Sequence, residues 1–212
     1  MCAYASPRDL HRHLEATAAL TPPLPGEDEE SDAEGGAADA EALSEDVARG
    51  VRLEPLAVRA YAEALCSDVL ETGLWTSSEH SFLGASPDGL VGDDGLVEVK
   101  APRALRRASD GIKPTWMAQM QGQMAITRRA WCDLVEVSQV SGNPRAVRIR
   151  VTRVPFCPAY WAWLLARLKA FWGNLQAGLE QAQPDTSART QARPMPPPTD
   201  CRVIIEAFAY SD

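Results

Sequence analysis

The chain has 212 residues, of which 45% are hydrophobic and 24% charged, and its formal net charge is −8. This length and balance are typical of one globular domain. There is no apolar run near the roughly 18 residues that a membrane span needs, and no basic region followed by an apolar stretch at the N-terminus. The five cysteines form no Cys-x-x-Cys pair. The composition thus excludes a membrane protein, a secreted disulfide scaffold and a cysteine-ligated zinc or iron–sulfur protein, and we expect a cytoplasmic protein with reduced thiols.

The charge is distributed unevenly along the chain. Residues 27–46 hold ten acidic residues and no basic one, whereas the stretch from Lys100 to Arg153 holds eleven basic residues and three acidic ones. The acidity therefore belongs to one segment, and the middle of the chain is basic. A net acidic chain is not typical of nucleic-acid-binding proteins, but here the net charge hides a basic middle segment.

Composition and periodicity predict four regions. We expect a short helical segment at 1–20, an acidic flexible insert at 21–46, a main domain at 47–180, and a Pro/Gln-rich tail at 181–212 with a last short strand at 201–210. At the start of the main domain, helical spacing runs from 47 to 70, where Pro55 either kinks one helix or lies in the first turn of a second.

The rest of the main domain alternates between strand and helix patterns. Strands are expected at 81–86, 96–100, 131–140 and 146–154, and helices at 114–128 and 158–179, with turns at 92–95 and 141–144. Four arginines alternate along the fourth strand, which is typical of a protected sheet edge: Arg145, Arg148, Arg150 and Arg153. This order predicts an α/β (α+β) fold with a central mixed sheet flanked by helices.

The stretch from Pro87 to Lys100 carries the chemistry. Because alternate side chains of a strand share a face, Glu98 and Lys100 point the same way, and the turn at 92–95 can bring Asp88 back beside Glu98. Two adjacent carboxylates repel each other unless a cation lies between them, and hard oxygen ligands suit Mg²⁺ or Mn²⁺. Lys100 could then orient or deprotonate an attacking water, or stabilise an oxyanion. The alternative is a solvated strand face with a simple ion pair.

At this point the sequence resembles a known family. Pro87-Asp88, nine residues, and then Glu98-Val99-Lys100 match the signature of the PD-(D/E)xK nuclease superfamily, whose core is restriction-endonuclease-like. The longer runs 84–91 and 95–102 resemble the YqaJ-type viral recombinase and phage lambda exonuclease family. Two more segments agree in order and spacing, because 49–55 is similar to a family helix with an extra glutamate and 116–124 to a Gln-x-Gln helix.

The resemblance implies roles for individual residues. Asp88, Glu98 and the Val99 carbonyl would ligate Mg²⁺, for which Mn²⁺ could substitute, and Lys100 would activate or position the water. Glu54 would lie at a second metal or hold a metal-bound water, and Gln119 would be a polar neighbour or a contact to the DNA backbone. Further DNA contacts would come from the basic segment and its helix, namely Arg103, Arg106, Arg107, Lys113, Gln121, Arg128 and Arg129.

The resemblance also implies an activity and partners. We expect a Mg²⁺-dependent DNA exonuclease of phage-type recombination, acting 5′ to 3′ on linear duplex DNA ends through a metal-activated water. A single-strand annealing protein and a ring-shaped homotrimer are its expected partners in a bacterial or phage-infected cell. The alternatives are a structure-specific or CRISPR-associated RecB-like endonuclease, and a catalytically silent DNA-binding scaffold.

Overall fold

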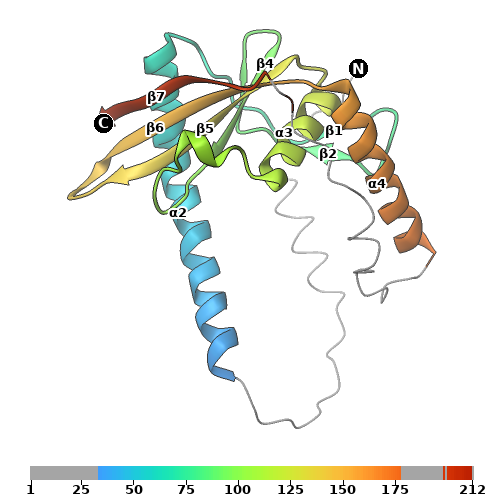
Figure 1. The fold of residues 1–212 in the computed structure, drawn as a ribbon, viewed down its shortest axis with the longest axis horizontal. Helices are drawn as coiled ribbons and strands as arrows, with labels where there is room; N and C mark the ends of the chain where they lie inside the picture. Colours follow the sequence, from blue (N-terminus) through green and yellow to red (C-terminus); the bar gives the residue numbers. More distant parts are fainter. Residues whose placement is uncertain (1–32, 178–197, 199, 212) are drawn as a thin grey trace.

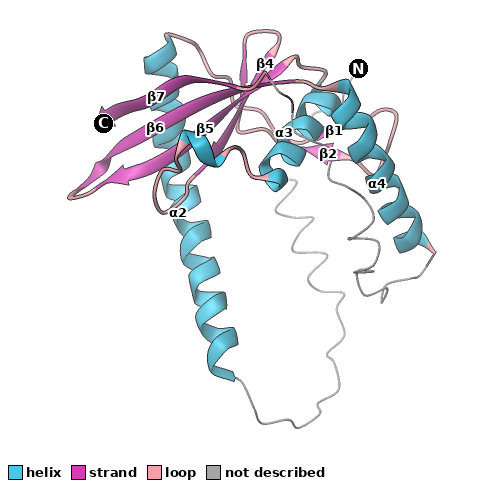
Figure 2. Ribbon diagram, in the orientation of Figure 1, coloured by secondary structure: helices cyan, strands magenta, loops and turns pink. Residues whose placement is uncertain are grey.

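A five-stranded mixed sheet forms the centre of the molecule, as seen in the computed structural model, which describes residues 33–177, 198 and 200–211 (Figures 1 and 2). Its strand order follows the chain: β3 (Gly89–Val91), β4 (Gly95–Lys100), β5 (Trp131–Val140), β6 (Asn143–Pro155) and β7 (Arg202–Ser211). Only the β4–β5 pair is parallel. It needs a crossover connection, and the helix α3 (Pro114–Thr127) provides one.

Helices cover both faces of this sheet. On one face, α2 (Ala33–Leu65) packs Leu53, Ala57 and Tyr61 against the odd-numbered strand residues, such as Val97 and Val99 of β4. On the other face, α3 and α4 (Pro158–Gln176) pack against the even-numbered ones. The methionines of α3 that lie on this face are Met117, Met120 and Met124. Glu98 and Lys100 therefore belong to the α3 side of the sheet.

The fold class and the last three elements were predicted correctly. The strand expected at 146–154 is β6, the helix expected at 158–179 is α4, and the strand expected at 201–210 is β7. The described part of the chain also contains the short η1 helix (Ala108–Asp110) and a small sheet of two strands, β1 (Trp75–Thr76) and β2 (Gly84–Ala85). The strand expected at 81–86 corresponds to β2 and is only two residues long. The helical segment expected at 1–20 and most of the tail lie outside the described residues.

The structure decides between the two interpretations of Pro55, because α2 runs from Ala33 to Leu65 as one helix with Pro55 inside it. The same helix includes residues 33–46, which were expected to belong to a flexible insert. Alanine and glutamate are strong helix formers, which explains this extension. The edge prediction for the four arginines is wrong, because β7 covers β6 and makes β6 an inner strand. Arg150 is buried and pairs with Glu136 of β5. In the described part of the chain, no helix is both long and apolar enough to cross a membrane.

Candidate active site

The β3–β4 hairpin brings Asp88 beside the strand that carries Glu98. The Asp88 backbone N–H donates to the Val97 carbonyl (3.2 Å), and its Oδ2 accepts a hydrogen bond from the Val99 N–H (2.6 Å). The next residue is Gly89, where an added Cβ would lie 2.3 Å from Cγ1 of Val69. Only glycine fits this close approach, so the Pro-Asp-Gly run sets the chain path that holds Asp88 against β4.

Glu98 lies at the centre of a small hydrogen-bonded group on the α3 side of the sheet. Its side chain is 2% exposed. Lys100 Nζ donates to Glu98 Oε1 (2.5 Å) and to Gln119 Oε1 (2.9 Å), and Gln123 Nε2 donates to Glu98 Oε2 (2.7 Å). The strand thus supplies an acid and a base on one face, and α3 supplies an amide to each of them. Lys100 remains partly accessible to solvent, with a side-chain exposure of 22%.

Burial and neighbouring negative charge raise the pKa of two carboxyl groups of the site, Asp88 and Glu54. Burial, and after it the charge of Glu98, raise the pKa of Asp88 to about 7; the hydrogen bond from Val99 N–H opposes this rise. Burial and Glu98 also raise the pKa of Glu54, which projects from α2. A pocket of about 490 Å³ opens here between α2 and the loop before β3, lined by Glu54, Arg59, Thr72, Ser86 and Asp88 among others. Carboxyl groups with raised pKa values beside an open pocket are suited to binding a cation.

The donor set fits a hard divalent cation that keeps several of its water ligands. In the described residues, no three side chains of His, Cys, Asp or Glu form a group that could hold a metal ion by themselves. Two carboxylates, a main-chain carbonyl and water are nevertheless a usual ligand set for Mg²⁺, which keeps several waters and seldom uses an all-protein cage. The residues that could hold it are Asp88, Glu98 and the Val99 carbonyl, with Glu54 across the pocket.

Comparison with known proteins decides the family. A family model described as a YqaJ-like viral recombinase domain matches residues 24–130. The chain belongs to this family. It is also similar to the crystal structure of the alkaline exonuclease LHK-Exo from Laribacter hongkongensis, with 28% identity over 90% of this chain and 89% of that chain and a TM-score of 0.58. LHK-Exo in complex with dAMP is similar at 30% identity, covering 89% and 88%, with a TM-score of 0.58. No curated protein matches the chain.

In this member of the YqaJ-like family, the predicted DNA-binding residues divide into two groups. Some lie on the surface beside the site: Arg106 and Lys113 stand 5.4 Å and 4.8 Å from the Trp116 ring, at the start of α3. Arg107 is exposed, and Arg103 is exposed and pairs with Asp46 of α2 (3.1 Å). These four lie on the loop between β4 and α3, which follows Lys100 directly.

The other three predicted DNA contacts have different surroundings. Gln121 is fully buried; its amide donates to the Pro155 carbonyl (2.8 Å) and accepts from the Cys157 N–H (2.8 Å), so it joins α3 to the start of α4. Arg129 donates to the carbonyls of Gly92 and Gly95 and braces the β3–β4 turn. Both polar groups of the Gln121 amide are engaged within the fold, so we do not retain Gln121 as a DNA contact. Arg129 is partly exposed and both of its bonds use Nη1, so its contact with DNA stays a prediction.

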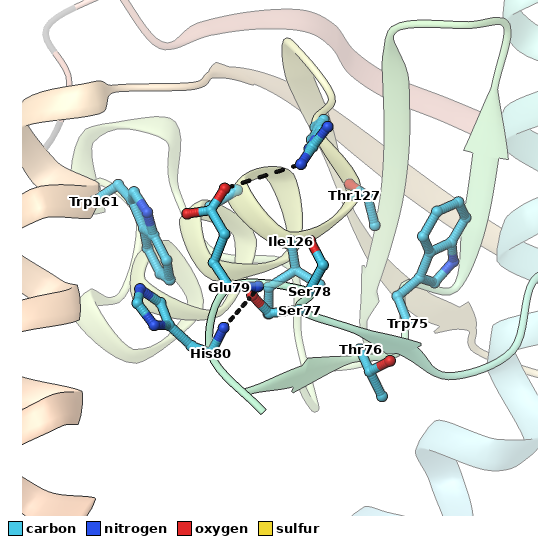
Figure 3. A pocket seen from close by; sticks show the side chains of 11 residues that line it. Trp75, Thr76, Ser77, Ser78, Glu79, His80, Ile126, Thr127 and Trp161 are labelled. Atoms are coloured by element: carbon cyan, nitrogen blue, oxygen red, sulfur yellow. Dashed lines mark hydrogen bonds and ion pairs between the residues drawn. The ribbon is translucent and has the colours of Figure 1, made fainter. Parts of the chain in front are cut away.

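Arg128 lies at the end of α3 that is remote from Lys100 and lines a second pocket of about 360 Å³. Figure 3 shows this pocket, with Trp75 and Trp161 among its labelled side chains. This pocket lies between β1, the loop after it, and α4. Its walls include Trp75 and Trp161. The Ser77 hydroxyl accepts hydrogen bonds from the N–H groups of Glu79 and His80. Nη2 of Arg128 lies 3.9 Å from Oε1 of Glu79. Nine residues of helix separate Arg128 from Gln119, or about 13 Å. Arg128 therefore lies away from the candidate active site, and its contact with DNA stays a prediction.

One residue of the site was missed by the sequence reading. Gln123 lies one helical turn after Gln119, so the two share a face of α3, while Gln121 points elsewhere. The spacing of four residues on a helix predicts that Gln119 and Gln123 are neighbours, whereas the Gln-x-Gln motif names Gln119 and Gln121.

Proposed function

We propose that this chain is a divalent-metal-dependent DNA exonuclease, acting on linear duplex ends in recombination of the phage type. One observation carries the proposal: the β3–β4 hairpin places Asp88 against the strand in which Glu98 and Lys100 share a face. Membership of the YqaJ-like family and similarity to an alkaline exonuclease support it. The similar structure that holds dAMP supports a 5′-mononucleotide as the product class.

Each residue has a role in this proposal. Asp88, Glu98 and the Val99 carbonyl hold the cation, which we propose to be Mg²⁺, with Mn²⁺ as a substitute. When bound, such a cation lowers the pKa of a water and neutralises charge on a phosphoryl group. Glu54 faces this position across the pocket and holds a water or a second cation. A 5′ to 3′ polarity, a homotrimeric ring and a single-strand annealing partner remain part of the proposal.

Lys100 positions the nucleophile. Two of its three N–H donors are held by Glu98 and Gln119, which fixes the ammonium group and leaves the third donor for a water or a phosphate oxygen. The loop that follows carries Arg103, Arg106, Arg107 and Lys113, which we propose contact DNA phosphates; Arg106 and Lys113 lie at the start of α3. Gln119 has its acceptor on Lys100 and keeps its amide donors for the DNA backbone.

The test uses linear duplex DNA, 5′-phosphorylated and labelled on one strand at a time, with Mg²⁺, Ca²⁺ or EDTA. We expect progressive Mg²⁺-dependent loss from one end, which establishes exonuclease activity and polarity together. A circular duplex of the same sequence should stay intact, and its cleavage would indicate an endonuclease instead. Binding without any cleavage would indicate a silent scaffold.

Variants locate the activity on the proposed residues. K100A should lower the rate by about 10²-fold or more, because the water loses its positioning group. E54Q should weaken the dependence on Mg²⁺ more than it weakens DNA binding. E63Q, on the same helix and exposed, is the matched control and should behave as the wild type. For K100A, a cleavage rate equal to that of the wild type would contradict the proposed role of Lys100 in positioning the water.

A further inference from the structure

Gln123 makes a contact that the proposed chemistry has not yet used. Its side chain is 3% exposed, and its Nε2 donates to Oε2 of Glu98 (2.7 Å), which is itself 2% exposed. The other carboxylate oxygen, Oε1, accepts from Lys100 Nζ (2.5 Å). Each oxygen of Glu98 therefore has its own donor, one from the strand and one from α3.

The orientation of the Gln123 amide follows from this contact. Turning the amide over would place its oxygen against the carboxylate oxygen, which is repulsive, so the nitrogen must face Glu98. In the orientation that Glu98 requires, Oε1 of Gln123 is buried and has no hydrogen-bond partner within the described residues. A buried acceptor without a donor is unfavourable, and native proteins hold few of them. The contact with Glu98 is kept in spite of this penalty.

The helix holds Gln123 in place. Its neighbours Met120 and Met124 are fully buried against the sheet, which fixes the rotation of α3, and the Thr127 hydroxyl donates to the Gln123 carbonyl (2.7 Å). Without Gln123, both oxygens of Glu98 would be free to turn toward the single cationic group of Lys100. With it, the plane of the carboxylate is set before any ligand arrives.

We propose that Gln123 is a positioning residue, which fixes the Glu98 carboxylate for the divalent cation and keeps it from turning fully onto Lys100. This inference rests on the proposed function. It assigns Gln123 no contact with the cation or with DNA. Groups that orient a metal ligand in this way typically change metal affinity or activity by 10- to 100-fold when they are replaced.

The experiment compares Q123M with Y61F. Methionine keeps the length of the side chain and removes the donor. Tyr61 is the matched control, because it also donates one buried hydrogen bond to a carboxylate, to Asp133 Oδ2 (2.8 Å), from α2 on the opposite face of the sheet. Two quantities are measured for each: the Mg²⁺ concentration that gives half-maximal cleavage, and the rise in Tm that Ca²⁺ or Mg²⁺ produces without DNA.

We expect Q123M to need about 10- to 100-fold more Mg²⁺ and to lose most of the cation-induced rise in Tm. Y61F should keep the wild-type value of both, even where its Tm without metal is lower. Equal losses in Q123M and Y61F would show a merely structural effect and overturn the inference, as would wild-type behaviour of Q123M. If Q123M fails to fold, Q123A is measured in its place, since alanine is the best helix former and leaves room for water.

Failure of the proposed function is distinguishable from failure of this inference. A wild-type protein that cleaves no DNA overturns the function, and the inference is then judged by the cation-induced rise in Tm alone. A wild-type protein that neither cleaves DNA nor shows a cation-induced rise in Tm would overturn both the proposed function and the inference about Gln123. Cleavage by the wild type with an unchanged Mg²⁺ dependence in Q123M overturns the inference and leaves the function standing.

Discussion

Two carboxylate sites of the central sheet, around Asp133 and around Asp88, differ in how their negative charge is compensated. On the α2 face, Asp133 is fully buried and its charge is answered by the protein: Tyr61 donates to it, and Arg153 donates two hydrogen bonds of 2.8 Å. Near the α3 face, Asp88 lies close to Glu98 and Glu54. Burial, and after it the charge of Glu98, raise its pKa to about 7, although the N–H that Asp88 accepts from Val99 opposes this rise.

This difference separates a structural carboxylate from a candidate metal ligand. A buried charge with a bidentate arginine and a hydroxyl has no need of an outside cation. A group of neighbouring carboxylates such as Asp88, Glu98 and Glu54 is stabilised when a cation binds. Asp133 lies in β5 and Asp88 lies beside β4, so the two sites belong to neighbouring strands of one sheet. The charges around each site distinguish their roles.

The largest effect is expected from D88N. Cleavage should fall by 10³-fold or more, because the proposed metal site loses a charged ligand, while the metal-free protein at pH 8 should gain a few kcal/mol of unfolding free energy, since ionised Asp88 is disfavoured in the fold. Cleavage assays and urea denaturation measure the two effects. D93N, an exposed aspartate in the turn of the same hairpin, is the control. A D88N protein that is both active and no more stable would remove the contrast with Asp133.

The opposite pattern is expected from R153M. Removing the bidentate partner leaves the buried charge of Asp133 with Tyr61 alone, which should lower the unfolding free energy by about 3 kcal/mol. Activity per folded molecule should stay at the wild-type level, as measured in urea titrations and in cleavage assays well below the midpoint. R145M changes an exposed arginine on the same strand and should alter neither quantity. Loss of cleavage in folded R153M would place this pair in the active site.

The pH dependence should show a third, smaller effect. Because the folded pKa of Asp88 is raised from 3.8 to about 7, its contribution to stability is present below pH 4 and is lost as the pH rises through 7 in the metal-free protein. Protons and the cation compete for Asp88, so at limiting Mg²⁺ the cleavage rate should rise by up to about tenfold per pH unit below pH 7 and level off above it. Saturating Mg²⁺ should move this rise to lower pH. A profile that does not respond to the Mg²⁺ concentration would contradict the competition.

The smallest effect is expected from the loop between β4 and α3, which we propose contacts DNA. R106A should weaken DNA binding at all sequences alike and lower the slope of log affinity against log salt by about 1, as expected for one phosphate contact. Binding is measured in Ca²⁺ at several salt concentrations. K169A, an exposed lysine on α4, is the control. An unchanged slope in R106A would indicate that the loop lies away from the DNA.

Local patterns in the sequence were enough for most of the fold and for the core of the site. The β3–β4 hairpin depends on a turn and on strand alternation, both of which are short-range, and these place Asp88, Glu98 and Lys100 together. The mixed sheet follows from the order of strands and helices. The family resemblance rests on the same residues, and the family model confirms it.

Long-range contacts decided the rest. A glutamine looks the same in the sequence whether it faces the site or the protein interior, so only the rotation of α3 against the sheet separates Gln123 from Gln121. Arginines behave likewise: Arg106 lies on the Trp116 ring, whereas Arg129 braces a turn that is more than 30 residues away in the chain.

The sequence by itself determined which chemical groups lie on one hairpin, because neighbours along the chain obey the two-residue period of a strand. Only the tertiary structure decided which charges are compensated. β7, which lies some 50 residues after β6, turns β6 into an inner strand, and α2 adds Tyr61 to Asp133 and Glu54 to the pocket beside Asp88. Charge compensation depends on all charged and hydrogen-bonding groups that lie near a carboxylate in space. Most of these groups come from residues that are distant in the chain.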